Sequence, residues 1–179
     1  RNAIAECATW ESGTVSINLS TRHFQSRTLA DFVCEVAASH NLPLNRIQLE
    51  ITETALFDDP QMAGKVIQDL RKRGIRVALD DFGTGYSSLF LLRALPIDKL
   101  KIDRSFVSTL TADRENATIV GALVGLGKAL GLQVTAEGVE DEATAEALRA
   151  MGCEFAQGFL FGSAMEFPRY DVTELRQVV

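Results

Sequence analysis

The sequence has little of several residue types that would define a fold or a site by themselves. Of its 179 residues, 3 are cysteine, 4 are proline and 2 are histidine. Cys7, Cys34 and Cys153 lie far apart, so neither a disulfide framework nor a CxxC zinc knuckle is indicated. His23 and His40 both lie away from the predicted strand ends, which excludes a three-histidine zinc site. We therefore expect the thiols to be buried structural groups.

Long apolar runs and an excess of positive charge are also absent. No stretch approaches the ~20 apolar residues of a membrane-spanning helix. The chain opens without a basic and then apolar leader, so we expect a cytoplasmic protein with no membrane segment. The net charge of -6 opposes binding of a DNA or RNA polymer. A small anionic ligand is compatible with this charge if metal ions supply positive charge at the site.

What the sequence does contain is the composition of a folded globular protein. Hydrophobic residues make up 46% and charged residues 23%, and the length suits a single domain with a real core. Residues 1–13 resemble the tail of a helix, and residues 167–179 are predicted to form a short terminal helix. No linker interrupts the chain, so we expect one domain over residues 1–179.

Six segments share one pattern, in which apolar residues lead to a polar residue at the C-terminal end. They are residues 14–20, 47–53, 75–80, 98–103, 132–137 and 154–159. Their starts are roughly 22–34 residues apart, which leaves room for a helix between successive strands. The repeat predicts an α/β fold with parallel strands.

The connecting segments carry clear helix signals. Residues 59–74 begin with Asp59 as the N-cap and Pro60 at the first helical position, and they end at Gly74. Residues 112–131 repeat this pattern, with an apolar face and a closing glycine. Both segments are therefore predicted to be crossover helices.

A polar residue lies at or near the C-terminal end of each predicted strand. Parallel strands bring these ends to one edge of the sheet, which is where α/β barrels hold their active sites. A single such residue would be explained as a helix cap or a loop-binding group. Six together predict a functional site, and they are Asn18, Glu50, Asp80, Lys101, Glu137 and Gln157.

The chemistry of this set indicates divalent cations. Carboxylate and amide oxygens are the ligands that Mg²⁺ and Mn²⁺ prefer. Asp80 and Asp81 are adjacent, and their repulsion is offset if cations bind between them. Two ions about 3.5–4 Å apart would stabilise both oxygens of an in-line phosphoryl displacement. The alternative, that Asp80 binds metal while Asp81 only caps the following loop, stays open.

Lys101 has two alternative roles in such a site. An ammonium group can orient the nucleophile or offset charge on a phosphate oxygen. It could instead form a Schiff base, as in an aldolase, but neighbouring carboxylates favour the protonated and unreactive amine. The first role is the one we expect.

The segment "FGTGYSS" follows Asp81 and is expected to form a loop that approaches the ligand. Its glycines permit sharp turns, and its hydroxyls offer hydrogen bonds. Glu53, just beyond its strand, could accept hydrogen bonds from this loop. The loop residues are Phe82, Gly83, Thr84, Gly85, Tyr86, Ser87 and Ser88.

Six motifs now stand in one order along the chain: "VSINLS", "LEITET", "ALDDFGTGYSSL", "LKIDRSFV", "TAEGVE" and "QGFLF". In this order the chain closely resembles the EAL family of cyclic di-GMP phosphodiesterases. The resemblance implies a TIM-like (β/α) barrel of the EAL type, with about six of the eight strands in this chain. It also implies hydrolysis of cyclic di-GMP to the linear dinucleotide pGpG with two Mg²⁺ or Mn²⁺ ions.

The resemblance assigns the metal ligands by motif. Asn18, Glu50 and Asp80 resemble the ligands of the first metal ion, and Asp80 with Asp81 resembles the pair that holds the second. Lys101 resembles the residue that orients the attacking water.

It also assigns roles to three further residues. Glu137 resembles the general base or a metal-linked acid. Gln157 resembles the residue that supports the network of metal, water and substrate. Glu53 resembles the glutamate that anchors the "DFGTGYSS" loop, through which family members couple dimer contacts to the metal site. A homodimer through this loop and the following helix is therefore expected.

The chain departs from the family pattern in two places. The Glu-Ala-Leu motif and the first strands are not in this sequence, so we expect a truncated EAL domain whose parent carries an upstream sensory or GGDEF domain. The segment "QGFLFGSAMEF" lacks the Arg-Pro pair often found after the glutamine. The alternative function is a catalytically inactive cyclic di-GMP receptor or a protein-interaction module.

Overall fold

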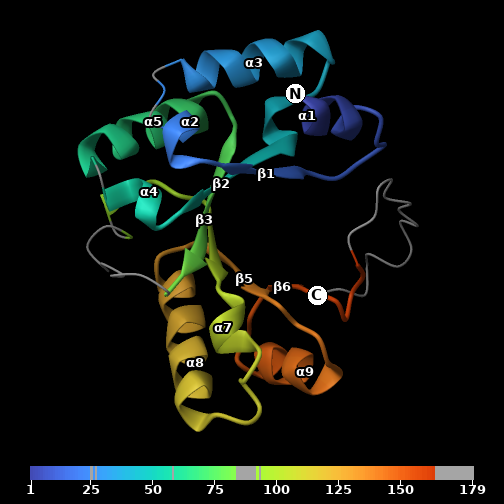
Figure 1. Ribbon diagram of the computed structural model, residues 1–179, viewed down its shortest axis with the longest axis vertical. Helices are drawn as coiled ribbons and strands as arrows, with labels where there is room; N and C mark the ends of the chain where they lie inside the picture. The colour runs from blue at the N-terminus through green and yellow to red at the C-terminus, as the bar shows by residue number, and fades with distance from the viewer. Residues whose placement is uncertain (25, 27, 58, 84–91, 93, 164–179) are drawn as a thin grey trace. The chain divides into compact units, whose positions relative to one another are not determined.

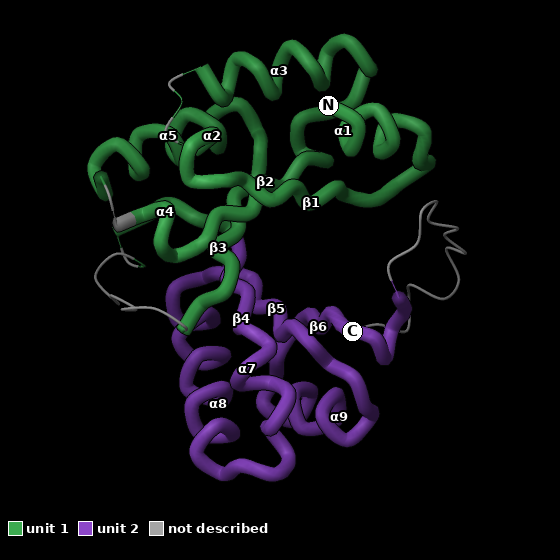
Figure 2. Tube along the Cα trace, in the orientation of Figure 1, with its two compact units in different colours: residues 1–98 green, residues 99–179 purple. Residues whose placement is uncertain are grey.

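The computed structural model describes residues 1–163 except residues 25, 27, 58, 84–91 and 93 (Figure 1). The chain divides into two compact units, residues 1–98 and residues 99–179 (Figure 2). The helix predicted at 167–179 lies outside the described residues, as does most of the "FGTGYSS" loop. In the part of the chain that the structure describes, each unit contains three parallel strands in chain order, which confirms the predicted α/β class.

Among its described residues, the first unit places three strands among five helices. The strands are β1 (Val15–Leu19), β2 (Ile47–Thr52) and β3 (Arg76–Phe82), with a short 3₁₀ helix at Leu44–Arg46. The helices are α1 (Asn2–Cys7), α2 (Thr21–Phe24), α3 (Leu29–Ser39), α4 (Thr54–Phe57) and α5 (Pro60–Lys72). Helix α5 contacts both β3 and α3, so it covers the sheet and joins it to the outer helices.

Alternation along β2 separates the core from the polar face of this sheet. Ile47, Leu49 and Ile51 are almost fully buried on one face. Gln48 and Glu50 are also buried, but they point to the opposite face because side chains alternate along a strand. One face of the unit therefore packs against apolar side chains, while the other carries polar groups.

The helix signals read from the sequence are confirmed in α5. The Asp59 carboxylate accepts a hydrogen bond from the Met62 backbone nitrogen at 2.9 Å, and Pro60 is the first helical residue. Gly74 follows with φ of 91°, a left-handed conformation that glycine adopts without steric cost. This stop turns the chain back toward β3.

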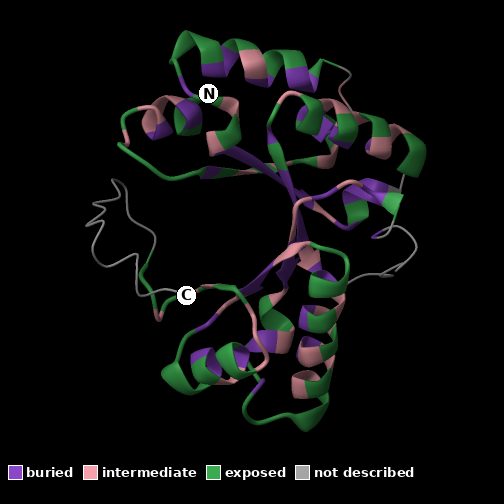
Figure 3. Cartoon of the chain, turned by 180° about the vertical axis from the view of Figure 1, so that it is seen from behind, coloured by how far each residue is buried: buried purple, intermediate pink, exposed green. Residues whose placement is uncertain are grey.

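The second unit repeats the design. Its strands are β4 (Lys99–Ile102), β5 (Gln133–Glu137) and β6 (Phe155–Gln157). Its helices are α7 (Arg104–Val107), α8 (Arg114–Ala129) and α9 (Glu142–Ala150). The core gathers aliphatic side chains from β4, β5 and these helices. Strands β4 and β5 are largely buried, β6 is mostly exposed, and the helices keep one exposed side (Figure 3). Among the described helices, none is long and apolar enough to cross a lipid bilayer.

Strand ends differ from the predicted bounds for local reasons. Strand β6 stops at Gln157 instead of residue 159, because the chain turns at Gly158, whose carbonyl accepts a hydrogen bond from Phe161. Strand β4 stops at Ile102, because Asp103 leaves the strand to cap α7. Strand β3 runs two residues further than predicted, to Phe82.

Two glycines of α8 allow a matched test of how closely this helix approaches β5. A Cβ added at Gly127 would collide with the buried Val134 side chain, whereas one at Gly125 would meet no atom within 4 Å. We expect Gly127→Ala to lower the free energy of unfolding by about 1–3 kcal/mol. Gly125→Ala should raise the free energy of unfolding by about 0.5–1 kcal/mol, because alanine is more favourable than glycine at an exposed position inside a helix. Urea unfolding of both variants measures this, and equal effects would contradict the packing.

Candidate active site

Three predicted ligands lie together on the polar face of the first unit. Asn18 on β1 is the direct register partner of Glu50 on β2, and Thr52 on β2 is the partner of Asp80 on β3. Partners in a parallel sheet point to the same face, and residues two apart on one strand do too. Asn18, Glu50 and Asp80 therefore share one face, as the sequence predicted.

The amide of Asn18 links the two carboxylates. Its oxygen faces Glu50 and Asp80, so oxygen atoms of all three side chains point toward one another. With the amide turned over, its nitrogen would donate to Glu50 Oε2 at 3.2 Å and to Asp80 Oδ2 at 3.3 Å. The arrangement suits a cation in the first orientation and two hydrogen bonds in the second.

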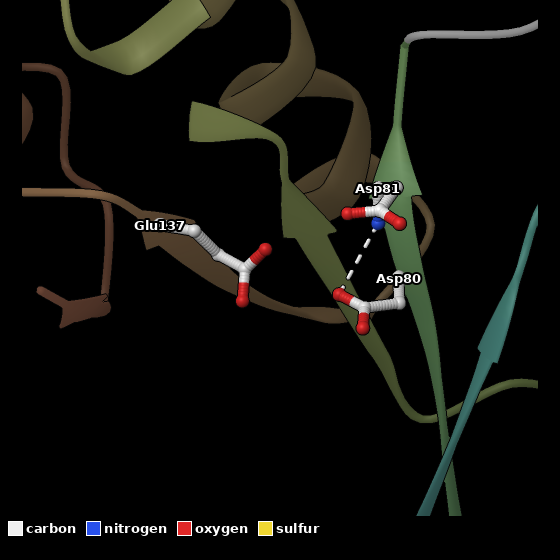
Figure 4. A group of neighbouring side chains, drawn as sticks. All are labelled: Asp80, Asp81 and Glu137. Carbon is white, nitrogen blue, oxygen red and sulfur yellow. Dashed lines mark hydrogen bonds between the residues drawn. The ribbon is translucent and has the colours of Figure 1, made fainter. Parts of the chain in front are cut away.

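Asp80 and Asp81 sit on the same side of β3 despite being adjacent (Figure 4). Strict alternation would place them on opposite faces. Asp81 has φ of 54°, a left-handed conformation that aspartate tolerates better than most residues. Its backbone nitrogen donates to Asp80 Oδ1 at 3.2 Å, and carboxylate oxygens of the two residues lie within 4.8 Å. The backbone strain thus brings two acidic groups together.

The second unit holds a buried ion pair. Lys101 Nζ lies 2.7 Å from Glu137 Oε1, and the two side chains are 6% and 15% exposed. Thr135 is the register partner of Lys101, so Glu137 lies two residues further along the same face of β5. Figure 4 also draws Glu137, at the end of β5. Gln157 on β6 is the partner of Glu137 and is exposed.

Close backbone contacts fix the loops that follow Glu137 and Gln157. The nitrogen of Val139 donates to Gln157 O at 3.0 Å, and the nitrogen of Leu160 donates to Val139 O at 3.1 Å. A Cβ at Gly158 would collide with the Val139 backbone, so only glycine fits there. These contacts hold the ends of β5 and β6 in register.

Asp141 anchors the same loop to helix α9. The backbone nitrogen of Thr144 donates to its carboxylate at 2.8 Å, and the Thr144 hydroxyl lies 3.0 Å from the other oxygen. These two hydrogen bonds, the backbone one first, lower the pKa of Asp141. The loop after Glu137 is thus tied down within four residues.

Glu53 is buried directly after β2, at 5% exposure. It lies between β2, which ends at Thr52, and α4, which begins at Thr54. Most of the loop that it is predicted to anchor, Thr84 to Ser88, lies outside the described residues. Its anchoring role stays a prediction.

The sequence analysis did not single out Gln48 or Ser16. Gln48 is buried and donates to Glu50 Oε1 at 3.1 Å and to Ser16 Oγ at 2.9 Å. The available signal was its spacing, because a residue two before Glu50 must share its face. What the spacing could not give was the register that places Ser16 beside it.

The donor set of the first unit fits a hard divalent cation. It consists of carboxylate and amide oxygens with no imidazole or thiolate, as Mg²⁺ and Mn²⁺ prefer. Glu50 and Asp80 are 6% and 8% exposed, so the donor set lies largely out of water. Asn18, Glu50 and Asp80, with Asp81 beside them, are the residues that would hold such a cation.

A family model described as the EAL domain matches residues 1–164. The chain belongs to the EAL domain family. It is 42% identical over 151 residues to the bifunctional diguanylate cyclase/cyclic di-GMP phosphodiesterase MucR of Pseudomonas aeruginosa, a match that covers 84% of this chain and 22% of MucR. The chain spans about a fifth of the length of the curated relatives it matches.

Solved EAL structures share the fold. The MucR phosphodiesterase in complex with c-di-GMP superposes with a TM-score of 0.87 and 38% identity, over 92% of this chain and 68% of that one. The EAL domain of Mycobacterium smegmatis DcpA superposes with a TM-score of 0.91 and 36% identity, over 99% of this chain and 82% of that one. A manganese and cyclic di-GMP complex of Klebsiella pneumoniae BlrP1 superposes with a TM-score of 0.83 and 30% identity, over 90% of this chain and 41% of that one. The predicted TIM-like EAL fold is confirmed.

The buried pair of the second unit can be tested by a double-mutant cycle in metal-free buffer. Lys101→Met should lower the free energy of unfolding by about 3 kcal/mol, because it removes the cation beside a largely buried carboxylate. The same change in a Glu137→Gln background should cost less, giving a coupling of about 1–3 kcal/mol. Urea unfolding of the four proteins measures this coupling.

An exposed pair provides the control. Arg71 Nη2 lies 2.9 Å from Asp98 Oδ1, and the two side chains are 42% and 25% exposed. The Arg71→Met and Asp98→Asn cycle should give a coupling below about 1 kcal/mol, because water screens this pair. Additive effects of Lys101→Met and Glu137→Gln would contradict the interpretation of their contact as a tight ion pair.

Proposed function

We propose that this chain is the substrate-binding and metal-binding part of a cyclic di-GMP phosphodiesterase that produces linear pGpG. The observation that carries the proposal is the convergence of the Asn18, Glu50 and Asp80 side chains on one face, in a chain of the EAL family. Relatives described as a cyclic di-GMP phosphodiesterase and as cyclic di-GMP complexes support the same substrate. A doubly anionic cyclic dinucleotide also suits a site charged by cations rather than by basic residues.

We propose that the oxygen donors of the first unit hold two divalent cations. Asn18, Glu50 and Asp80 would hold one divalent cation, and Asp80 with Asp81 would hold another. Two such cations, when bound, supply the positive charge that polarises the phosphodiester and makes water a better nucleophile. Mg²⁺ and Mn²⁺ both fit the oxygen donors, and the manganese complex of BlrP1 supports the latter.

The second unit would supply the proton chemistry. The Lys101 contact fixes one oxygen of Glu137, so the carboxylate is held in a single orientation from which it accepts the proton of the attacking water. The oxygen of water bonds to phosphorus, the bond from phosphorus to the 3′ oxygen breaks, and a proton ends on that oxygen. Gln157, the neighbour of Glu137, would hydrogen-bond to water or substrate. Lys101 also offsets negative charge on the phosphoryl oxygens.

The remaining assignments are proposed on the same basis. Glu53 would anchor the loop of residues 82–88, and this loop with the following helix would form a homodimer contact. We propose a cytoplasmic location and an upstream sensory or GGDEF domain, since MucR is described as also a diguanylate cyclase.

Substitution of two carboxylates tests the function in the longer protein that contains this domain. Asp80→Asn removes a charged metal ligand, and Glu137→Gln removes the proton acceptor, so each should lower the rate of pGpG formation at least about 10²-fold. The measurement is chromatography of the product with Mg²⁺ or Mn²⁺ present and with chelator.

The matched control is Glu146→Gln, which neutralises an exposed carboxylate on α9 and should leave the rate unchanged. No turnover by the unaltered protein with either metal would contradict the phosphodiesterase function. Tight cyclic di-GMP binding with no product over hours would instead establish the alternative, a receptor.

A further inference from the structure

We propose that Gln48 is a positioning residue for the metal ligand Glu50, an inference that rests on the proposed function. Its amide nitrogen lies 3.1 Å from Glu50 Oε1 and 2.9 Å from Ser16 Oγ. Gln48 is 4% exposed and Glu50 is 6% exposed, so both groups lie where unsatisfied polar atoms are costly. None of the motifs that identify the family includes Gln48.

The strand geometry makes this contact unavoidable. Gln48 and Glu50 are two residues apart on β2, so their side chains share a face. The parallel register pairs Ser16 with Gln48 and Asn18 with Glu50 on the same two strands. A row of four polar side chains results, in which Ser16 fixes Gln48, Gln48 fixes Glu50, and Glu50 faces Asn18.

The orientation of the Gln48 amide is determined by its partners. A carboxylate only accepts hydrogen bonds, so the amide nitrogen and not the oxygen must face Glu50 Oε1. The nitrogen carries two hydrogens, and the second is donated to the Ser16 hydroxyl oxygen. Turning the amide over would lose the bond to Glu50 and place an oxygen against a carboxylate. Gln48 therefore has one stable orientation in the folded protein.

Because this donor is fixed, the two oxygens of the Glu50 carboxylate have different partners. Oε1 accepts from Gln48, while Oε2 faces the Asn18 amide that also faces Asp80. The terminal torsion of a glutamate is otherwise soft, so a carboxylate without such a donor can rotate. By holding Oε1, Gln48 aims Oε2 at the point shared with Asn18 and Asp80. It thereby lowers the entropic cost of binding a cation there.

Manganese binding to the longer protein, without nucleotide, tests this assignment. Gln48→Met keeps a side chain of similar length and removes the donor, and it should weaken Mn²⁺ binding about 10–100-fold, the usual effect of losing a partner that orients a metal ligand. Isothermal titration gives the dissociation constant directly. The reaction rate should recover when Mn²⁺ is raised, since Gln48 acts through the metal ligand Glu50.

Two further variants separate positioning from a general loss of structure. Ser16→Ala removes an exposed hydroxyl that orients Gln48 and should weaken Mn²⁺ binding in the same direction but less. Gln133→Met makes the matched change at the start of β5 and should leave Mn²⁺ affinity unchanged. Far-ultraviolet circular dichroism checks that each variant is folded. If Gln48→Met is not folded, the Mn²⁺ affinity of Ser16→Ala decides whether Gln48 is a positioning residue.

The outcomes distinguish this inference from the function on which it rests. Unchanged Mn²⁺ affinity in folded Gln48→Met and in Ser16→Ala overturns the positioning role, while product formation by the unaltered protein leaves the phosphodiesterase intact. Weakened Mn²⁺ binding in both variants, with Gln133→Met unaffected, supports it even if the protein proves to be a receptor. An unaltered protein that neither binds Mn²⁺ nor forms product overturns both.

Discussion

Repulsion among oxygen atoms on one face of a parallel sheet is the constraint on which this structure depends. In the first unit the register places Asn18, Glu50 and Asp80 where their side chains face one another, and both carboxylates are largely buried. Each carboxylate must be satisfied there, because burying a charge without partners is costly. The partners that the fold supplies determine what else can bind.

The two units meet this constraint with different chemistry. In the first, the Gln48 amide donates to Glu50 and the backbone nitrogen of Asp81 donates to Asp80. In the second unit, the ammonium group of Lys101 contacts the Glu137 carboxylate directly. The described contacts thus orient carboxylates through amide groups in the first unit and through an ion pair in the second.

Much of this arrangement could be predicted from sequence because it depends on local patterns. Alternation along β2 and the polar ending of each strand placed Asn18, Glu50 and Asp80 on one face, as observed. The cap at Asp59 and the stop at Gly74 are similarly local, since each depends only on neighbours within one turn. Such features need no knowledge of which strands pair.

What escaped prediction depends on register or on backbone conformation. Ser16 meets Gln48 only because β1 pairs with β2 in one register, and a shift by one residue would reverse the faces. Asp81 lies beside Asp80 because of its positive φ. Aspartate occurs both at strand ends and in left-handed turns, so the residue type alone does not predict this conformation. The early end of β6 follows from the packing of Gly158 on Val139, a contact between separate loops.

The orientation of the Asn18 amide is linked to the proposed cation site. An amide nitrogen has no lone pair to offer a metal, so Asn18 could bind a cation only through its oxygen. The orientation that donates to Glu50 and Asp80 is therefore incompatible with ligation. Gln48 is different, because its hydrogen bond goes to Oε1 while Oε2 faces Asn18. Under the proposed function, a bound cation would turn the Asn18 amide but would leave the hydrogen bond from Gln48 to Glu50 in place.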